Sequence, residues 1–244
     1  MARRLYFILA LLLSGCSFSP HGIDQGALAR AARVDRFPVT DADISKAVAL
    51  RAQLPSSFKV AVWFRPSNPW RSSEHRFDWA PEDRELIQES LRALAESGVI
   101  TEVVPLADAL FPDESVRGAR FAAARQGADA VLVVTGAAGL ESYSNAAALL
   151  YWTIVGLWVA PGSQTDGVCY LAASLWDVRT GFLYLAAETR GTARRRAPYM
   201  HVDELAVADE ARKDAIADLA RELQLRAAKL MGAETAQPGQ QAAR

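Results

Sequence analysis

The chain has 244 residues, of which 51% are hydrophobic, enough for one sizeable folded domain with flexible ends. Its 27 Lys and Arg residues and 28 Asp and Glu residues leave a formal net charge of −1. Proteins that bind nucleic acid usually carry a strong basic excess, so this balance argues against nucleic-acid binding.

The N-terminus has the pattern of a secretory leader. Arg3 and Arg4 precede the apolar run 5–13, which has about the length of a signal-peptide core. A helix of that length, at about 1.5 Å per residue, is too short for a bilayer core of roughly 30 Å, so a cleaved signal is favoured over a spanning anchor. Removal of residues 1–15 would take away two arginines and no acidic residues, which would change the formal net charge from −1 to −3.

The run ends in Leu13-Ser14-Gly15-Cys16. This motif resembles the lipobox of bacterial lipoproteins, in which a signal peptidase recognises the residues that Leu13, Ser14 and Gly15 match here. The resemblance implies cleavage before Cys16 and acyl chains on the cysteine, which anchor strongly because a single chain holds only marginally. Ser17, the residue after the cysteine, resembles lipoproteins that are sorted to the outer membrane. An Asp at that position favours retention at the inner membrane. The alternatives are an ordinary signal peptide with a coincidental cysteine, or a short transmembrane anchor.

Residues 16–57 are predicted to be a lipidated N-terminus and a tether with some local helix. Residues 25–36 are alanine-rich and suit one or two helical turns. Thr40 is a candidate N-cap for a short helix that runs to about Leu54.

From residue 58 the chain alternates between apolar strands and amphipathic helices. Helix signals are Pro81 at a first helical position and glycines after the two helices, at Gly98 and Gly127. Such alternation predicts a parallel β-α-β-α-β core over residues 59–135 with right-handed crossovers. The predicted strands are 59–64, 99–105 and 130–135, and the second helix is 114–126, with Val116, Ala119, Phe121 and Ala123 towards the core.

The second half of the chain has a different pattern of hydrophobic residues. Residues 168–190 predict an antiparallel hairpin around Arg179-Thr180-Gly181, with alternate residues from Val168 to Trp176 on one face. Residues 202–231 predict a long C-terminal helix. The expected fold class is therefore α/β, a sheet of two or three layers, with a periplasmic domain at 58–232 and a disordered tail at 233–244.

The uncharged stretch 146–161 lies between these two halves. It is shorter than the roughly 20 residues needed to span a membrane. Three interpretations stay open: a buried helix or helix plus strand packed on the sheet; an interfacial segment with Tyr151, Trp152 and Trp158 at headgroup level; and a protein–protein contact.

Residues suited to catalysis are sparse. His21, His75 and His201 have no metal-ligand spacing, and neither G-x-S-x-G nor a P-loop occurs, so we expect no catalytic residues, metal or cofactor. Residues 136–139 contain two glycines but lack a dinucleotide fingerprint, which favours a plain turn. Cys169 lies in an apolar strand pattern and is expected to be buried and inert.

Charged and aromatic clusters also have plain explanations. The acids Glu82, Asp83 and Glu85 suit the positive end of a helix dipole. We expect Arg194-Arg195-Arg196 to be a solvated turn rather than a headgroup contact. The loop aromatics are expected to cover the end of the sheet rather than line a groove, and they are Trp70, Phe77 and Trp79.

The chain resembles the rhombotarget lipoproteins, a bacterial family of unknown biochemical role. The resemblance rests on the lipobox, on Leu54-Pro55 with the strand 59–64, on residues 127–131 and above all on 153–163. Some members end in a sorting tail with a hydrophobic segment, which residues 238–244 lack, so rhombosortase processing is not expected.

The order of elements is more distantly similar to the periplasmic domain of curli-type secretion lipoproteins and to the N-terminal domain of the Tol translocation protein. Fold does not fix function, however. In those secretion lipoproteins the pore-forming segments alternate with period 2. Residues 146–160 are apolar throughout, so a barrel pore is not expected.

These features predict a lipoprotein anchored through Cys16 in the outer membrane, facing the periplasm. We expect it to bind or scaffold an envelope protein of unknown identity rather than to act as an enzyme. One alternative is a subunit of an oligomeric envelope or secretion complex that assembles through 146–161. The other is an envelope hydrolase whose site the sequence does not disclose.

Overall fold

The computed structural model describes residues 22–32, 39–66, 77–95, 98–111, 113–201 and 203–235. One mixed sheet has the strand order β2-β1-β3-β4-β5. β1 pairs in parallel with β2 and β3, and β3, β4 and β5 pair antiparallel. The predicted α/β class, with a parallel core, a hairpin and a long last helix, is confirmed. The strands are β1 (Phe58–Phe64), β2 (Ile100–Pro105), β3 (Ala130–Ser144), β4 (Ser163–Asp177) and β5 (Leu183–Ala197).

The crossover helices form where the sequence predicts them. α4 (Pro81–Ala95) is followed by Gly98 with φ +79°, and α5 (Val116–Arg125) by Gly127 with φ +69°. Small side chains of α5, such as Ala119 and Ala123, are buried against the sheet. The prediction for Phe121 is wrong, because its side chain faces solvent and lies beneath the Arg125 guanidinium.

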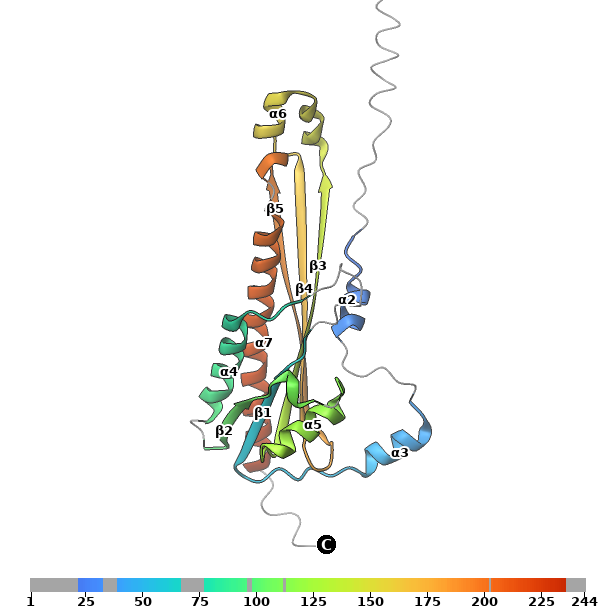
Figure 1. Cartoon of the computed structure of the whole chain (residues 1–244), viewed down its shortest axis with the longest axis vertical. Coiled ribbons are helices and arrows are strands. Elements are labelled where there is room, and N and C mark those ends of the chain that lie inside the picture. The colour runs from blue at the N-terminus through green and yellow to red at the C-terminus, as the bar shows by residue number, and fades with distance from the viewer. Residues whose placement is uncertain are drawn as a thin grey trace, which may run out of the picture.

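The antiparallel strands are much longer than predicted. β3, β4 and β5 have 15 residues each, and β3 pairs with β4 without a break from Ala130↔Asp177 to Ser144↔Ser163. They form a long arm that projects beyond β1 and β2 (Figure 1). The added residues are mainly glycine, alanine and polar residues, which give no hydrophobic alternation to read. The predicted turns at 136–139 and 194–196 are therefore wrong, since both segments are strand.

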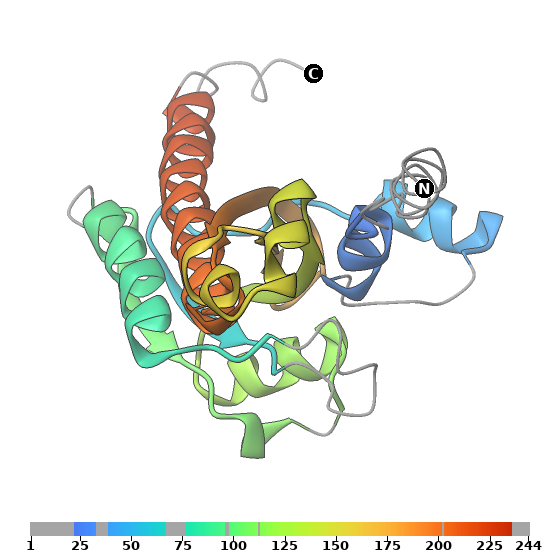
Figure 2. The ribbon, with the colours of Figure 1, turned by 90° about the horizontal axis from the view of Figure 1, so that it is seen from above.

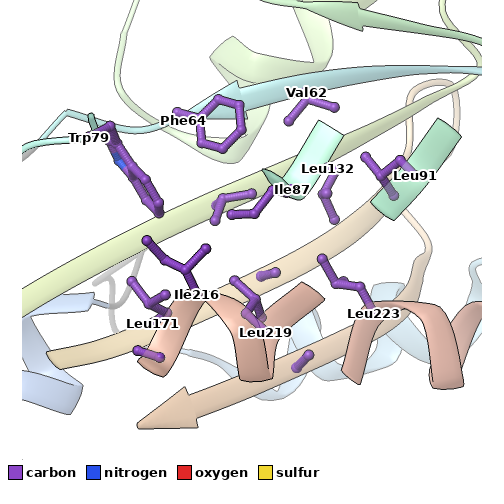
Figure 3. Close-up of a cluster of buried hydrophobic side chains, with 14 of the residues drawn as sticks. Val62, Phe64, Trp79, Ile87, Leu91, Leu132, Leu171, Ile216, Leu219 and Leu223 are labelled. Carbon is purple, nitrogen blue, oxygen red and sulfur yellow. The ribbon is translucent and has the colours of Figure 1, made fainter. Parts of the chain in front are cut away.

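The last helix, α7 (Glu204–Thr235), covers one face of the arm and contacts α4. Residues 233–235, expected in the tail, are helical. α7 approaches the sheet very closely at Gly191, where an added Cβ would lie 2.0 Å from the carbonyl oxygen of Ala211. Figure 3 shows the core on this face, drawn from β1, α4, β3, β4 and α7. Its labelled members are Val62, Phe64, Trp79, Ile87, Leu91, Leu132, Leu171, Ile216, Leu219 and Leu223.

The opposite face of the arm carries α2 (Gln25–Ala32). Leu28 is fully buried there beside Ala137 and Val168. The Thr135 hydroxyl donates to the carbonyl oxygen of Ala32 at 2.5 Å. Part of the segment expected to be a tether therefore packs on the domain, because a short helix with one apolar stripe gains more by burial than by solvation.

A second helix, α3 (Asp41–Ala49), has the predicted N-cap. Thr40 and Asp43 form a reciprocal capping box, and no side chain of this helix is buried. The helix ends at Ala49 rather than near Leu54. Figure 2, seen from above, shows α3 well away from the central arm.

The Tyr184 hydroxyl fixes the segment before β1 to the base of the hairpin. It accepts the backbone N–H groups of Gln53 at 2.8 Å and Leu54 at 3.0 Å and donates to Asp177 Oδ2 at 2.7 Å. Burial raises the pKa of Tyr184 to about 12. Asp177 also accepts the N–H groups of Arg179 and Thr180, so the predicted turn is held by this one carboxylate.

Removing the hydroxyl by Tyr184→Phe should destabilise the domain by about 1–3 kcal/mol, because Asp177 Oδ2 and two backbone N–H groups each lose a hydrogen-bond partner. Thermal unfolding of the purified domain measures this. Tyr199→Phe is the matched control, since that ring is exposed. An unchanged melting temperature for Tyr184→Phe would contradict the proposed fixing role.

Candidate functional site

The far end of the arm carries the most unusual surface of the molecule. Residues 145–162, which join β3 to β4, and η4 (Tyr199–His201) together form what we call the cap (Figure 1). It contains η3 (Ala146–Trp152) and α6 (Ile154–Val159), and α6 contacts both η3 and η4.

Asn145 closes the base of the cap. Its Oδ1 accepts the N–H of Ala147 at 2.8 Å, which caps η3, and its Nδ2 donates to the carbonyl oxygen of Pro161 at 2.8 Å. Its own N–H donates to the Gly162 carbonyl oxygen at 2.7 Å. An added Cβ at Gly162 would lie 2.5 Å from the nitrogen of Ala148, so only glycine fits. These bonds join the two ends of the cap to each other.

Most large hydrophobic side chains that are exposed among the described residues lie on or beside the cap. Trp152 is 90% exposed and Trp158 is 52% exposed. The interpretation of this insert as a helix buried on the sheet is therefore wrong. The exposed set is Leu149, Leu150, Trp152, Val155, Trp158, Val159, Tyr199, Met200 and Leu205.

The three aromatic residues singled out in the sequence do not behave alike. Tyr151 is half-buried and its hydroxyl lies 3.1 Å from Ser163 Oγ. Its ring meets Tyr199 edge-on, with centroids 6.1 Å apart. Trp158 meets His201 at 5.7 Å, and Trp152 points outward as the most exposed member. Tyr151 thus supports the cap, while Trp152 and Trp158 form its surface.

A polar network crosses the sheet just below the cap, on the α2 face. Arg194 donates to both oxygens of Asp166 at 2.8 Å, and Tyr143 donates to the same carboxylate at 3.2 Å. Arg196 Nε donates to Gln164 Oε1 at 2.9 Å. Burial alone would raise the pKa of Asp166, but hydrogen bonds from Arg194, Gln164 and Tyr143 hold it below its usual range. The network pins three strands together where they meet the cap.

The α7 face has a surface hollow of about 590 Å³ beneath the cap. Ser142 is its central polar residue, donating to Glu204 Oε1 at 2.7 Å and lying 2.9 Å from Thr165 Oγ1. Among the described residues, no histidine or cysteine lines this hollow, and Ser142 has a carboxylate rather than an imidazole beside it. A serine without a base that can take its proton is a poor nucleophile. The other lining residues are Tyr143, Ser144, Ser163, Tyr199, Asp203 and Leu205.

A second hollow lies between α4 and α7, at the acids that the sequence suggested. Asp83 is buried, accepts the Ala80 N–H at 3.0 Å and pairs with Arg212 at 3.1 Å. Burial raises the pKa of Asp83 even though Arg212 lowers it. Asp83 therefore starts α4, as expected, and also fastens α4 to α7.

The other candidates for chemistry have structural roles. Phe77 and Trp79 are buried over the end of β1 and the adjoining part of β3, in line with the prediction that they cover the end of the sheet, and the Trp79 indole donates to the Arg65 carbonyl oxygen at 2.9 Å. The Phe77 ring occupies the space above Gly136. Within the described part of the chain, no group of three or more His, Cys, Asp or Glu residues is placed to hold a metal ion.

Several sequence candidates fall outside the described residues. They are the lipobox (Leu13, Ser14, Gly15 and Cys16), His21, Trp70 and His75. Among the helices that the structure describes, none combines the length and the apolar character that crossing a bilayer requires.

Cys169 is fully buried, and desolvation raises the pKa of its thiol to about 12. At pH 8 its thiolate fraction is then on the order of 10⁻⁴, compared with roughly a quarter for a free thiol. We expect alkylation of Cys169 by iodoacetamide in a Cys16→Ala chain to be at least about 1000-fold slower in the native state than in urea. Mass spectrometry follows the reaction, and fast native labelling would show that the thiol is reactive.

Comparisons with known proteins leave the family open. No family model matches the chain, and no curated protein matches it. Solved structures give partial likenesses. A dodecameric PelC variant from Paraburkholderia phytofirmans is 18% identical, with a TM-score of 0.31 over 73% of this chain and 93% of that one. A Xanthomonas campestris protein of the DUF330 family is 16% identical, with a TM-score of 0.33 over 77% and 93%.

A third likeness is to a homologue of a neuraminyllactose-binding hemagglutinin from Helicobacter pylori. It is 10% identical, with a TM-score of 0.37 over 82% of this chain and 96% of that one. At these identities and TM-scores the likenesses decide neither the fold nor the function of this chain.

Proposed function

We propose that this protein is a lipoprotein of the outer membrane whose periplasmic domain is a binding or scaffold module of the cell envelope. The observation that carries the proposal is the sequence Leu13-Ser14-Gly15-Cys16 at the end of the apolar run 5–13. The only other cysteine, Cys169, is enclosed in the core and is not available to pair with Cys16. Cys16 is therefore free for acylation.

The surroundings of the titratable groups support a binding role over catalysis. Asp83, Asp166 and Asp177 are each held by an arginine, a tyrosine or backbone N–H groups. Such arrangements fasten elements to one another, and a catalytic acid or base instead needs an open cleft where it can meet a substrate. The hydrolase alternative is correspondingly weaker.

The oligomer alternative is favoured by one observation, the exposed apolar side chains of the cap. An exposed patch of this kind marks contact with another protein or with a membrane. Light scattering on the unlipidated domain distinguishes a monomer from a ring or dimer formed through the cap.

Changing Cys16→Ala behind a secretory signal that is cleaved without lipidation should abolish acylation and release the protein into the soluble periplasmic fraction. Incorporation of labelled palmitate and fractionation of the envelope measure the two effects. Cys169→Ala is the matched control and should keep both the label and the membrane attachment. A wild-type chain that takes up no label would refute the lipoprotein assignment.

A further inference from the structure

We propose that the cap inserts into the surface of the same membrane in which the acyl chains of Cys16 are anchored. The proposal rests on the lipid anchor proposed above and adds a second, non-covalent contact with lipid. Three features of the described residues support it: the position of the tether, the chemistry of the cap surface and the state of its polar groups.

The tether joins the domain near the cap. The N–H of Gly22 donates to Glu141 Oε1 at 3.0 Å, and Glu141 lies three residues before the end of β3 at Ser144. Three strand residues rise about 10 Å. The six residues from Cys16 to Gly22 span at most about 20 Å in any conformation. An anchor on Cys16 therefore keeps the bilayer within reach of the cap and away from the hairpin turn at the other end (Figure 1).

The cap surface has the composition of an interfacial element. Residues 142–165 contain no charged side chain. The outward residues combine aliphatic side chains such as Val155 and Val159 with two tryptophans, Trp152 and Trp158. Tryptophan prefers the headgroup region of a bilayer, where its ring is partly dehydrated and its N–H meets water. Acyl chains at the same end keep this surface close to the lipid at no further cost in translational entropy.

Several polar groups of the cap are already bonded within the protein. η3 and α6 are short helices, and Asn145 binds the ends of the loop. Backbone groups that are bonded in this way can enter the interface at a lower desolvation cost than unpaired ones. Below it, Asp166 binds Arg194, and Gln164 accepts from Arg196. A protein partner usually needs several hydrogen bonds across the interface, and these groups are occupied.

The charged residues next to the cap distinguish apolar insertion from electrostatic binding to anionic lipid. The base of the cap carries Arg194, Arg195 and Arg196 together with Asp166 and Glu210, and Arg195 pairs with Glu210 at 3.3 Å. Two of the three arginines are paired with acids and Arg196 bonds the neutral Gln164, so we expect the attraction to lipid to be mainly apolar. Insertion of the cap should therefore change little with salt or with the fraction of anionic lipid, unlike contact made by a basic patch.

The test uses the lipidated full-length protein, reconstituted into vesicles of phosphatidylethanolamine and phosphatidylglycerol that carry bromine on their acyl chains. Bromine quenches only tryptophans that lie in the lipid. We expect quenching in the wild type, loss of most of it in Trp152→Phe/Trp158→Phe, and little effect of salt. Trp176→Phe is the control, because Trp176 lies at the opposite end of β4, where quenching should not depend on it.

A second pair of variants keeps the reporter tryptophans. Val155→Glu should abolish the quenching by placing a charge on the cap, while Phe121→Glu changes an exposed apolar side chain on α5 and should leave it intact. A protein that stays in the vesicles without cap-dependent quenching would overturn the inference and leave the lipid anchor standing. Cap-dependent crosslinking of two copies in place of quenching would overturn it in favour of self-association. Failure to enter the vesicles at all would count against the anchor itself.

Discussion

The close packing of α7 on the antiparallel strands is the interaction on which the rest of the structure depends. A long three-stranded ribbon has two faces to cover, and α7 covers one of them along most of its length. The helix can approach because Gly167 and Gly191 face it, opposite Val207, Ala211 and Ala215. Small residues on both partners bring the backbones together, and the contact holds the ribbon straight enough to carry a cap at its end.

This packing divides the molecule into two parts with different physical tasks. The parallel half, with β1, β2, α4 and α5, contains the buried apolar strand β1 and a core of aliphatic and aromatic side chains, and it anchors the fold. The arm has less apolar surface and is stabilised by its hydrogen-bonded ladder, by α7 on one face and by α2 on the other. The arm separates the cap from the core, so the side chains of the cap can stay exposed without weakening the interior.

Buried polar groups fasten these parts together. Asp83 joins α4 to α7, Thr135 joins β3 to α2, and Tyr184 joins the hairpin to the segment before β1. Each pairing satisfies a group that would be costly to bury alone. These polar groups therefore join elements of the fold to one another. Most of the large exposed apolar side chains among the described residues lie elsewhere, on or beside the cap.

The sequence by itself determined the local features, because caps, turns and apolar runs act over a few residues. It predicted the parallel core, the presence of α4 and α5 and the glycines that follow them, the N-cap at Thr40, the turn at Gly181 and the burial of Cys169. The lipobox is likewise readable only in the sequence, and its acylation stays a prediction.

Only the tertiary structure decided the long arm and the place of the apolar insert. The outer halves of β3, β4 and β5 are rich in glycine, alanine and polar residues, which have little strand preference of their own. They become strands because their neighbours pair with them and because α2 and α7 cover them. The sequence of 146–161 is likewise compatible with a core helix or with a surface element, because the hydrophobicity of a segment does not show what it packs against. Its exposure followed from the arm that holds it away from the core.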